Sequence, residues 1–466
     1  MALVVKNNMA ALNTLNIMGK NNKALSSSLQ KVSSGMKINS AADNPAGYAI
    51  SERMRTQIRS LDQDNQNAQN GQNMLKTAEG AVSSTVEILK TLKEKVLDAA
   101  NDTNTTYDRK TMQDYLDQAV DQINDNASTT YNGQLLVDGS KNKEQSATKV
   151  VYSNASFSTN VSFTSALTNL HDRNGGKLDI QSSDKLSVSF VSNGKTFTTT
   201  ITVGSLTSKV GGDTLQDVFK LANSLVTGSA SAVANIGKFN TNATDATAKS
   251  GDMHATSVIG QTAEGVTMYT ADGKNVLSVA ASVAGLSGNI SGFTLSVTGT
   301  DGNIKKSVDS ILDAWDEQIG AQDKSNDNAI TMQIGTKSNQ AIRVGLSDMR
   351  ARALGLQGVS PDGRVQNLDI TTRANANASI NVLDNAVQKA LKEQTKIGSV
   401  ESRLDYTQDN LTTQSENVQA SESTIRDANM AKEMTEYTKN NVLMQASQAM
   451  LAQANQSSQN ILQLLQ

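Results

Sequence analysis

The residues of this chain most able to do chemistry are few and scattered. It has two histidines, His171 and His254, and no cysteine. Neither histidine has a second His at the spacing of a zinc motif such as HExxH, so no metal site is expected, and two exposed loop histidines are the simpler interpretation. The lack of cysteine excludes disulfides and thiolate nucleophiles.

A second candidate is Gly194-Lys195-Thr196, which resembles the end of a phosphate-binding loop. Ser189 stands where GxxxxGK[ST] requires its first glycine. Residues 186–192 and 195–203 alternate in the manner of strands, and Asn193-Gly194 suits a type I′ turn. The sequence therefore predicts a β-hairpin here rather than a phosphate site.

Paired carboxylates are the third candidate. Asp98 and Asp102, and likewise Asp121 and Asp125, lie four residues apart on predicted helices. A solvated helix face is the commoner explanation of such pairs than a buried catalytic dyad. The sequence predicts neither an enzyme nor a cofactor.

Composition narrows the class of protein further. The 466 residues are 37% hydrophobic and only 3% aromatic, with a formal net charge of -3. Helix-to-helix packing suits this composition better than an aromatic ligand pocket, and without a basic run nucleic acid is a poor partner. The N-terminus lacks the pattern of a cleaved secretory signal, and no stretch approaches the ~20 apolar residues of a membrane span, so export by another route or a cytoplasmic location is expected.

Hydrophobic periodicity is confined to the two ends, which must form long helices. One seam with steps of three and four residues runs through Leu15, Met18, Asn22, Leu25, Leu29, Val32 and Met36. A sevenfold series follows at Met54, Leu61, Ala68, Leu75, Val82, Leu89 and Val96. Between them, Pro45 suits a first helical position and Asp43 or Asn44 a cap. A third helix is predicted around residues 112–123.

The C-terminal end repeats this arrangement. Its sevenfold series is Leu383, Ala390, Ile397, Leu404, Leu411, Val418 and Ile425. The register then breaks, and a new seam runs through Met430, Tyr437, Met444, Leu451, Ser458 and Leu465. Sevenfold series of similar length need partner helices, so the two ends are predicted to pair.

The terminal helices also carry unusual amounts of uncharged polar surface. Residues 440–466 contain no charged side chain. Amides accompany the seams at Asn8, Asn13, Asn16, Asn21, Asn22, Gln445, Gln448, Gln453 and Gln456. Ordinary exposed surface would explain the amides alone, but 27 uncharged residues are hard to reconcile with a fully solvated helix. Contact between subunits is the sharper hypothesis.

The middle of the chain is rich in Ser, Thr, Gly and Val. Further turns are predicted at Asp272-Gly273 and Asp301-Gly302, and short helices at residues 215–226 and 308–319. The predicted fold is mainly α: a long antiparallel, coiled-coil-like helical bundle formed by both chain ends, with an α+β insertion over residues 141–327.

Several segments at the two ends resemble bacterial flagellins. Residues 32–47 are similar to the N-terminal signature of that family, and residues 423–434 are similar to its C-terminal one. Residues 131–136, 348–356, 450–456 and 461–465 match in family order. The resemblance covers about 1–140 and 328–466.

The resemblance implies a self-assembling filament subunit of the bacterial flagellum, secreted to the exterior without a cleaved signal. Residues 1–44 with 426–466 would form the inner core of a tube, 45–140 with 328–425 a surrounding helical stem with a small β part, and 141–327 its variable surface. Expected partners are further copies, the export apparatus, an export chaperone at the C-terminus, the filament cap and hook-associated proteins, with no nucleic acid or membrane.

Two residue sets follow from the periodicity and the resemblance together. The inner-core polymerisation seam is predicted at Leu15, Met18, Leu25, Leu29, Val32, Met430, Tyr437, Met444, Leu451, Leu462 and Leu465. The stem core is predicted at Leu61, Leu75, Val82, Leu89, Val96, Leu383, Ile397, Leu404, Leu411, Val418 and Ile425.

One segment departs from the family pattern. Flagellins seen by the flagellin-sensing Toll-like receptor carry Gln-Arg-Val-Arg-Glu-Leu on the long helix, and the matching stretch here is Lys90-Thr91-Leu92-Lys93-Glu94-Lys95. Thr91 replaces an arginine and Lys95 a leucine, whereas Glu94 is retained. Weak receptor recognition is expected.

Three alternatives remain open. A hook–filament junction protein shares the helical ends, although its C-terminal sequence usually matches the flagellin ending poorly. A filament subunit with a metalloprotease insertion would need the missing HExxH motif. The Ser/Thr-rich insertion could also add an adhesive or glycan-bearing surface to a filament subunit.

Overall fold

The computed structural model describes residues 8–205, 213–226, 254–270, 273–359 and 364–464, without the side chains of 225–226, 254–256 and 458–464. The chain forms two compact units. The first comprises Met1–Gln69, Gln333–Ala341 and Asp405–Gln466, and the second comprises Asn70–Met332 and Ile342–Leu404. Both chain ends lie in the first unit.

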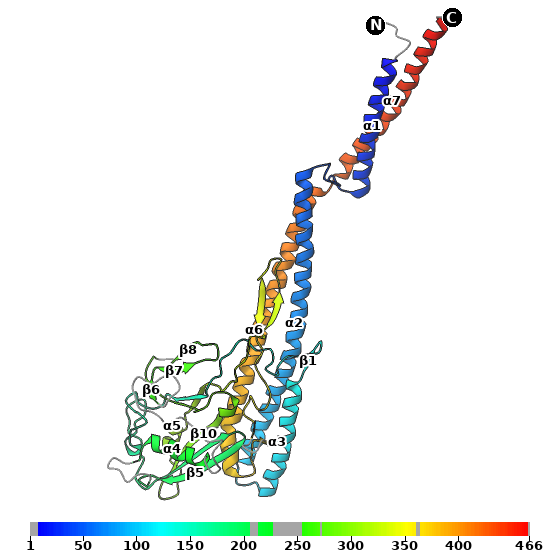
Figure 1. Cartoon of the computed structure of the whole chain (residues 1–466). Coiled ribbons are helices and arrows are strands. Elements are labelled where there is room, and N and C mark those ends of the chain that lie inside the picture. Colours follow the sequence, from blue (N-terminus) through cyan, green and yellow to red (C-terminus); the bar gives the residue numbers. More distant parts are fainter. Residues whose placement is uncertain (1–7, 206–212, 227–253, 271–272, 360–363, 465–466) are drawn as a thin grey trace. The chain divides into compact units, whose positions relative to one another are not determined.

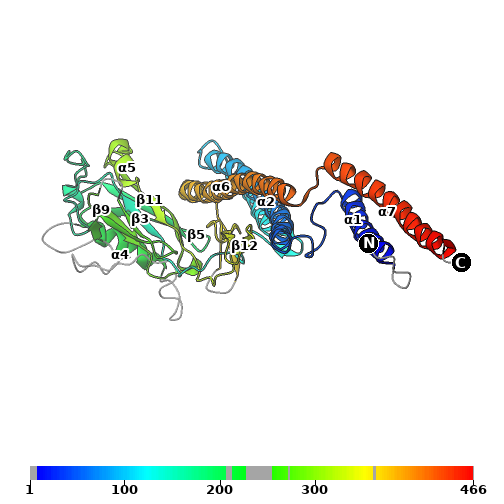
Figure 2. The same ribbon diagram turned by 90° about the horizontal axis from the view of Figure 1, so that it is seen from above.

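Two helices pair at the chain ends. Helix α1 (Met9–Ser34) begins where the Asn8 side chain accepts from the backbone N–H of Ala11, and it ends at Gly35, whose φ of 71° closes the helix in the left-handed region. Helix α7 (Met430–Leu464) lies beside α1 in both ribbon views (Figures 1 and 2). The predicted pairing of the two ends is confirmed.

The two longest helices run through both units. Helix α2 (Pro45–Ala99) begins at the predicted proline, and the side chain of Asn44 caps it by accepting from the N–H of Gly47 at 3.0 Å. Helix α6 (Arg373–Arg426) ends where the sevenfold register breaks. One series of buried positions of α2 recurs at steps of three and four, with Ser51, Ala81 and Val86 buried beside it: Leu61, Asp64, Ala68, Gly71, Leu75, Ala78, Val82, Thr85, Leu89, Leu92, Val96 and Ala99.

A third helix completes the helical part of the second unit. Helix α3 (Thr106–Ala127) opens with a capping box between Thr105 and Asp108. Its Gln113 donates to the carbonyl of Leu368 and accepts from the N–H of Ile370, which holds the segment before α6 against α3. The small strand pairs are β1 (Thr130–Tyr131) with β2 (Gln134–Leu135), β12 (Ile330–Gln333) with β13 (Ala341–Val344), and β14 (Gln357–Val359) with β15 (Val365–Asn367).

The inserted region contains two antiparallel sheets. One has the order β10-β4-β5, with β4 (Lys185–Ser192), β5 (Lys195–Thr202) and β10 (Ile290–Thr298). The other has the order β11-β3-β9-β6, with β3 (Val151–Asn154), β6 (His254–Thr256), β9 (Val276–Ala280) and β11 (Asp316–Ile319). Strands β7 (Val258–Gln261) and β8 (Thr267–Tyr269) form a separate hairpin.

The predicted hairpin is confirmed: β4 and β5 pair in full register, and Asn193 and Gly194 have φ of 50° and 77°. The helix predicted at residues 215–226 is present as α4 (Leu215–Val226). The helix predicted over 308–319 is only partly right. Helix α5 (Lys306–Leu312) stops early, because residues 316–319 pair with β3 as β11, and cross-strand bonding overrides local propensity. The turn predicted at Asp301-Gly302 is present, because the N–H of Gly302 donates to the carbonyl of Gly299 at 3.0 Å. The turn predicted at Asp272-Gly273 includes residue 272, which lies outside the described residues.

Candidate assembly interface

The pairing faces of α1 and α7 mix apolar and polar side chains at heptad spacing. On α1 the half-buried or buried positions are Ala11, Thr14, Met18, Asn21, Leu25, Ser28 and Val32, with Lys31 beside the last of them. Among the described side chains of α7 they are Glu433, Tyr437, Asn440, Met444, Ser447, Leu451 and Ala454, with Asn441 beside Asn440. Each helix thus meets the other along one narrow face, the geometry of a two-stranded coiled coil.

Hydrogen bonds between side chains link these faces at separate levels. Asn21 Nδ2 donates to Ser447 Oγ at 2.8 Å, and Asn440 Nδ2 donates to Ser28 Oγ at 3.0 Å. At the far end of the pair, Asn8 Nδ2 donates to the carbonyl of Ala454 at 3.2 Å. Polar pairs at core positions cost stability but fix the register of two helices.

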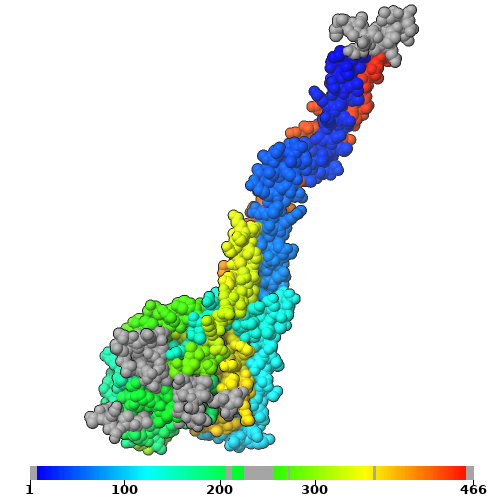
Figure 3. All heavy atoms as spheres, in the orientation of Figure 1, coloured from blue at the N-terminus to red at the C-terminus, as the bar shows by residue number. Residues whose placement is uncertain are grey.

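The other faces of both helices expose apolar side chains. Half of the large hydrophobic side chains exposed among the described residues lie on these two helices. They are Met9, Leu12, Leu15, Ile17 and Leu29 on α1, and Met430, Met434, Val442, Leu443 and Met450 on α7. The space-filling view shows α1 (blue) lying against α7 (red) while much of its own surface remains open (Figure 3). A soluble helix seldom exposes so much apolar surface unless another chain covers it.

The predicted polymerisation seam divides between the two kinds of face. Met18, Leu25, Val32, Tyr437, Met444 and Leu451 are half-buried on the pairing faces. Leu15, Leu29 and Met430 point outward, with exposed fractions of 45%, 52% and 43%. Leu462 belongs to α7, but the structure does not describe its side chain. Leu465 lies outside the described residues. Asn22, placed in the seam by its spacing, is exposed, whereas its neighbour Asn21 lies on the pairing face.

Arg426 organises the junction between the helices of the first unit, a role that spacing alone did not reveal. Its buried guanidinium donates to Glu52 Oε1 at 2.6 Å and to Met36 Sδ at 3.1 Å, and it lies 5.6 Å from the centre of the Tyr48 ring. The hydrogen bond from Arg426 lowers the pKa of Glu52. The N–H of Lys37 donates to the Arg426 carbonyl at 2.7 Å, so one residue fixes both connections, α1 to α2 and α6 to α7.

The predicted stem-core residues occupy the inner faces of α2 and α6. All five on α2 are buried, and so are Leu383, Ile397, Leu404 and Leu411 on α6. Val418 and Ile425 are half-buried. Asp64 is a charged residue at a core position of α2, which the hydrophobic periodicity did not predict. It is 5% exposed, and burial raises its pKa.

The segment compared above with the receptor-binding stretch lies on α2. Lys90, Glu94 and Lys95 are exposed, and Thr91 is half-buried with its hydroxyl donating to the carbonyl of Glu87. Lys93 forms an ion pair with Asp384 of α6. The lysine at residue 93 is therefore held toward the neighbouring helix.

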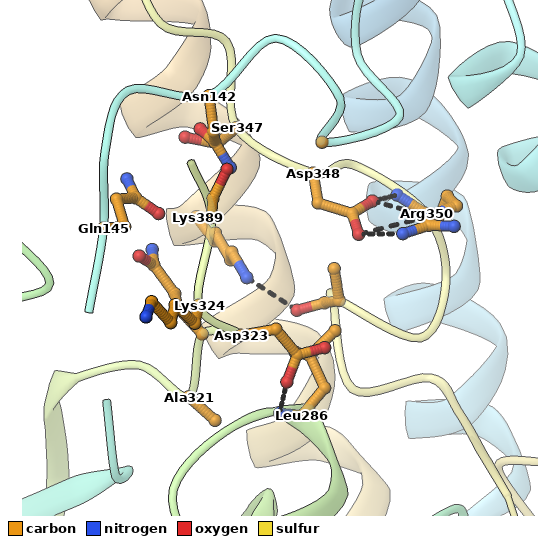
Figure 4. A pocket seen from close by; sticks show the side chains of 14 residues that line it. Asn142, Gln145, Leu286, Ala321, Asp323, Lys324, Ser347, Asp348, Arg350 and Lys389 are labelled. Carbon is orange, nitrogen blue, oxygen red and sulfur yellow. Dashed lines mark hydrogen bonds and ion pairs between the residues drawn. The ribbon is translucent and has the colours of Figure 1, made fainter. Parts of the chain in front are cut away.

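A polar cavity of about 210 Å³ in the second unit is the best candidate for a ligand site. Figure 4 shows its charged side chains turned toward other protein groups: Asp348 holds Arg350 in a fork, and Lys389 Nζ donates to the carbonyl of Ala353 at 2.6 Å. Asp323 accepts from the N–H of Leu286 at 2.8 Å. These contacts indicate that the cavity's charges join segments of the fold.

Neither a metal site nor a membrane span was identified in the described part of the chain. Its His, Asp and Glu side chains form no group of three or more suited to holding a metal ion. His171 Nδ1 lies 3.0 Å from the carbonyl oxygen of Asn169 in a loop. None of the described helices is long and apolar enough to cross a bilayer.

Paired helical ends with apolar outer faces, joined through an α+β insertion, define the class of self-assembling structural subunits. Residues 5–142 match the bacterial flagellin N-terminal helical region, and residues 380–465 match the bacterial flagellin C-terminal helical region. A flagellin of Clostridium tyrobutyricum is 32% identical over 458 residues, spanning 98% of this chain and all of that one. The chain belongs to the bacterial flagellin family.

A second relative agrees. A flagellin of Bacillus subtilis (strain 168) is 28% identical over 478 residues, covering 99% of both chains. The flagellar hook associated protein-3 of Legionella pneumophila covers 80% of this chain and 98% of its own, but at 15% identity and a TM-score of 0.32 it supports no argument. Flagellins are a structural family, and this chain is a subunit of the bacterial flagellar filament, which self-assembles and serves motility.

Proposed function

We propose that the chain polymerises through the outer faces of α1 and α7 and catalyses no reaction. The observation that carries this proposal is the run of exposed apolar residues opposite the pairing faces, from Leu12 to Leu29 and from Met430 to Met450. Neighbouring copies would cover these residues with their own terminal helices. Burial of one leucine-sized side chain stabilises an interface by about 1.5–3 kcal/mol, so the contacts favour assembly strongly.

The layers of the filament follow from this proposal. Residues 1–44 and 426–466 would line the inner core, 45–140 and 328–425 would form the stem around it, and 141–327 would face outward. The chain would leave the cell through the flagellar export apparatus, with a chaperone on its last ~45 residues and the cap and hook-associated proteins as later partners. The uncharged run 440–466 supports a segment that exchanges one protein partner for another.

Seeded polymerisation of purified chain tests the proposed interface. Deletion of residues 444–466 should leave a soluble monomer that does not grow filaments. Ile17→Gln and Leu443→Gln, which change only outer-face residues, should each raise the critical concentration about 10- to 100-fold, the equivalent of about 1.4–2.8 kcal/mol. Val266→Gln, at an apolar residue of the insertion that is 59% exposed, is the matched control and should grow normally. Normal filaments from the truncated chain would refute the assignment.

Weak recognition by the flagellin-sensing Toll-like receptor is the second part of the proposal. It rests on Thr91 and Lys95, which stand where the matching pattern has arginine and leucine. In a reporter-cell assay, the chain should require at least about tenfold more protein than a strong agonist, the loss expected from about 1.4 kcal/mol of contact energy. Thr91→Arg with Lys95→Leu should restore the response. An unmodified chain as potent as the agonist would contradict this part alone.

A further inference from the structure

The methionines of this chain differ sharply in exposure according to their place in the fold. Among the described residues, those with exposed side chains are Met9, Met430, Met434 and Met450, at 62%, 43%, 46% and 62%. All four lie on α1 or α7. In the second unit, Met332 and Met349 are 6% and 1% exposed.

A thioether is the side chain of this surface that small oxidants attack most readily. Peroxide transfers one oxygen atom to the sulfur: the O–O bond breaks, an S–O bond forms, the sulfur loses two electrons and the peroxide is reduced to water. The product, methionine sulfoxide, is polar and no longer fits an apolar contact, and sulfoxide reductases reverse the change. Exposure of the sulfur controls the rate.

We propose that Met9, Met430, Met434 and Met450 form a reversible oxidation site for peroxide-class oxidants that blocks assembly of the free subunit. This inference rests on the proposed function, because the same four side chains lie on the faces assigned to contacts between copies. Oxidation places a polar sulfoxide where the neighbouring chain would bury a thioether. Once a subunit is in the filament, the covering helices shield the sulfurs, so the sensitive state is the unassembled chain.

The pairing of α1 with α7 survives the modification. Met18 and Met444 are half-buried on the pairing faces, and Met36 Sδ accepts a hydrogen bond from Arg426 at 3.1 Å. These three residues are less exposed than the outer four. Oxidation at limiting peroxide therefore changes the surface offered to other copies and leaves the fold of the subunit in place.

The first test measures oxidation by peptide mass spectrometry on the full-length chain treated with hydrogen peroxide. In the monomer, the four outer methionines should oxidise at least tenfold faster than Met332 and Met349. In assembled filaments, the rates at the outer four should fall at least tenfold, while those at Met332 and Met349 stay unchanged. Equal rates at outer and buried methionines, or no protection in filaments, would overturn the proposal.

The second test links oxidation to assembly. Peroxide-treated monomer should extend seeds at least tenfold more slowly than untreated monomer, with unchanged far-ultraviolet circular dichroism, and methionine sulfoxide reductase should restore growth. A chain with all four outer methionines changed to leucine should extend seeds at the same rate before and after peroxide treatment, whatever that rate is, whereas Met332→Leu with Met349→Leu should remain sensitive. If the peroxide-treated wild-type chain extends seeds as fast as the untreated chain, the oxidation proposal is refuted and the proposed function is not. If the untreated wild-type chain never extends seeds, the proposed function itself is refuted. The experiment with methionine sulfoxide reductase uses the wild-type sequence, so it tests whether oxidation blocks assembly even if the fourfold variant folds poorly.

Discussion

Glu317 is a carboxylate placed inside the second unit, on β11. It is half-buried and pairs across the strands with Tyr152 of β3, whose hydroxyl donates to the carbonyl of Ile290 at 2.7 Å. Burial raises the pKa of Glu317 to about 7, against the attraction of Lys389 on α6 and with a further upward contribution from Asp316. Burial also lowers the pKa of Lys389. The carboxyl therefore changes charge near neutral pH.

The pH dependence has a definite sign. Because the pKa of Glu317 is higher in the folded than in the unfolded state, its contribution to stability is full below pH 4.5 and is lost as the pH rises through about 7. At about 1.36 kcal/mol per pKa unit, the loss is at most about 3 kcal/mol. Glu317→Gln should flatten the dependence of unfolding free energy on pH between 5 and 8.

The emission of Trp315 provides the readout. This sole tryptophan is buried within 6.5 Å of Phe157 and 6.4 Å of Phe163, ring centre to ring centre, so unfolding around β11 exposes it. Glu264→Gln, at an exposed acid in the same region, should keep the slope of the wild type. An unchanged slope in Glu317→Gln would show that another group titrates.

Asp64 is a second misplaced charge, at a core position of α2. No described group hydrogen bonds its Oδ2, and burial raises the pKa of the carboxyl. Its penalty is absent below the ordinary value of 3.8, grows as the pH rises from there through the higher folded pKa, and is constant above it. Asp64→Asn should therefore increase the unfolding free energy at pH 7 by about 1 kcal/mol, and should change it little at pH 3. Denaturant melts at both pH values, with exposed Asp114→Asn as the control, check this.

At the scale of helices, the amide and hydroxyl pairs decide how α1 meets α7. Asn440→Ala removes the bond to Ser28 Oγ, which lies at a buried position of α1 that is 6% exposed. The loss of one such bond costs about 1 kcal/mol, or about a fivefold rise in critical concentration for seeded growth. Asn275→Ala, at an exposed amide of the insertion, should have little effect. An equal effect from both would mean that the bond does not set the register.

The helices were predictable because their signals are repeated many times. Seven apolar residues at sevenfold spacing on each long helix specify partner helices whatever surrounds them, and Pro45 marks one boundary clearly. The hairpin was equally clear, since Asn193 and Gly194 supply the positive φ of its turn.

The pairing face of α1 could not be predicted in the same way. Leu15 and Leu29 are as apolar as Met18 and Leu25, yet they lie outward, because α1 carries apolar residues on more than one face. Hydrophobic periodicity does not distinguish between such faces. The polar residues Asn21 and Ser28 make the face that pairs with α7 less hydrophobic, so it is harder to recognise. Residues 316–319 were missed for a different reason: a strand distant in sequence, β3, determines their conformation.

At the scale of the whole chain, the insertion has a hydrophobic core of its own. Every member of its main buried cluster lies between Val150 and Ala321, including the stacked rings of Phe219 and Phe293 at 4.9 Å. The insertion approaches the stem closely at Gly292, with φ of 60°, where an added Cβ would lie 2.4 Å from the carbonyl oxygen of Ala378. Domain boundaries at 141 and 327 remain a prediction, and a separate core is the reason to test them.

The fragment 141–327 should therefore fold without the helical ends. We expect it to unfold in one cooperative transition, with Trp315 emission as blue-shifted as in the full chain, because its aromatic neighbours are all retained. Its stability should fall less steeply with rising pH if water reaches Glu317 once α6 is removed, since hydration lowers the pKa of a desolvated acid. A fragment bearing Phe219→Ala is the matched control and should lose about 3–5 kcal/mol, because this fully buried ring leaves a cavity in the cluster. A wild-type fragment with red-shifted emission and no cooperative melt would place the boundary elsewhere and make the stem part of the insertion's folding unit.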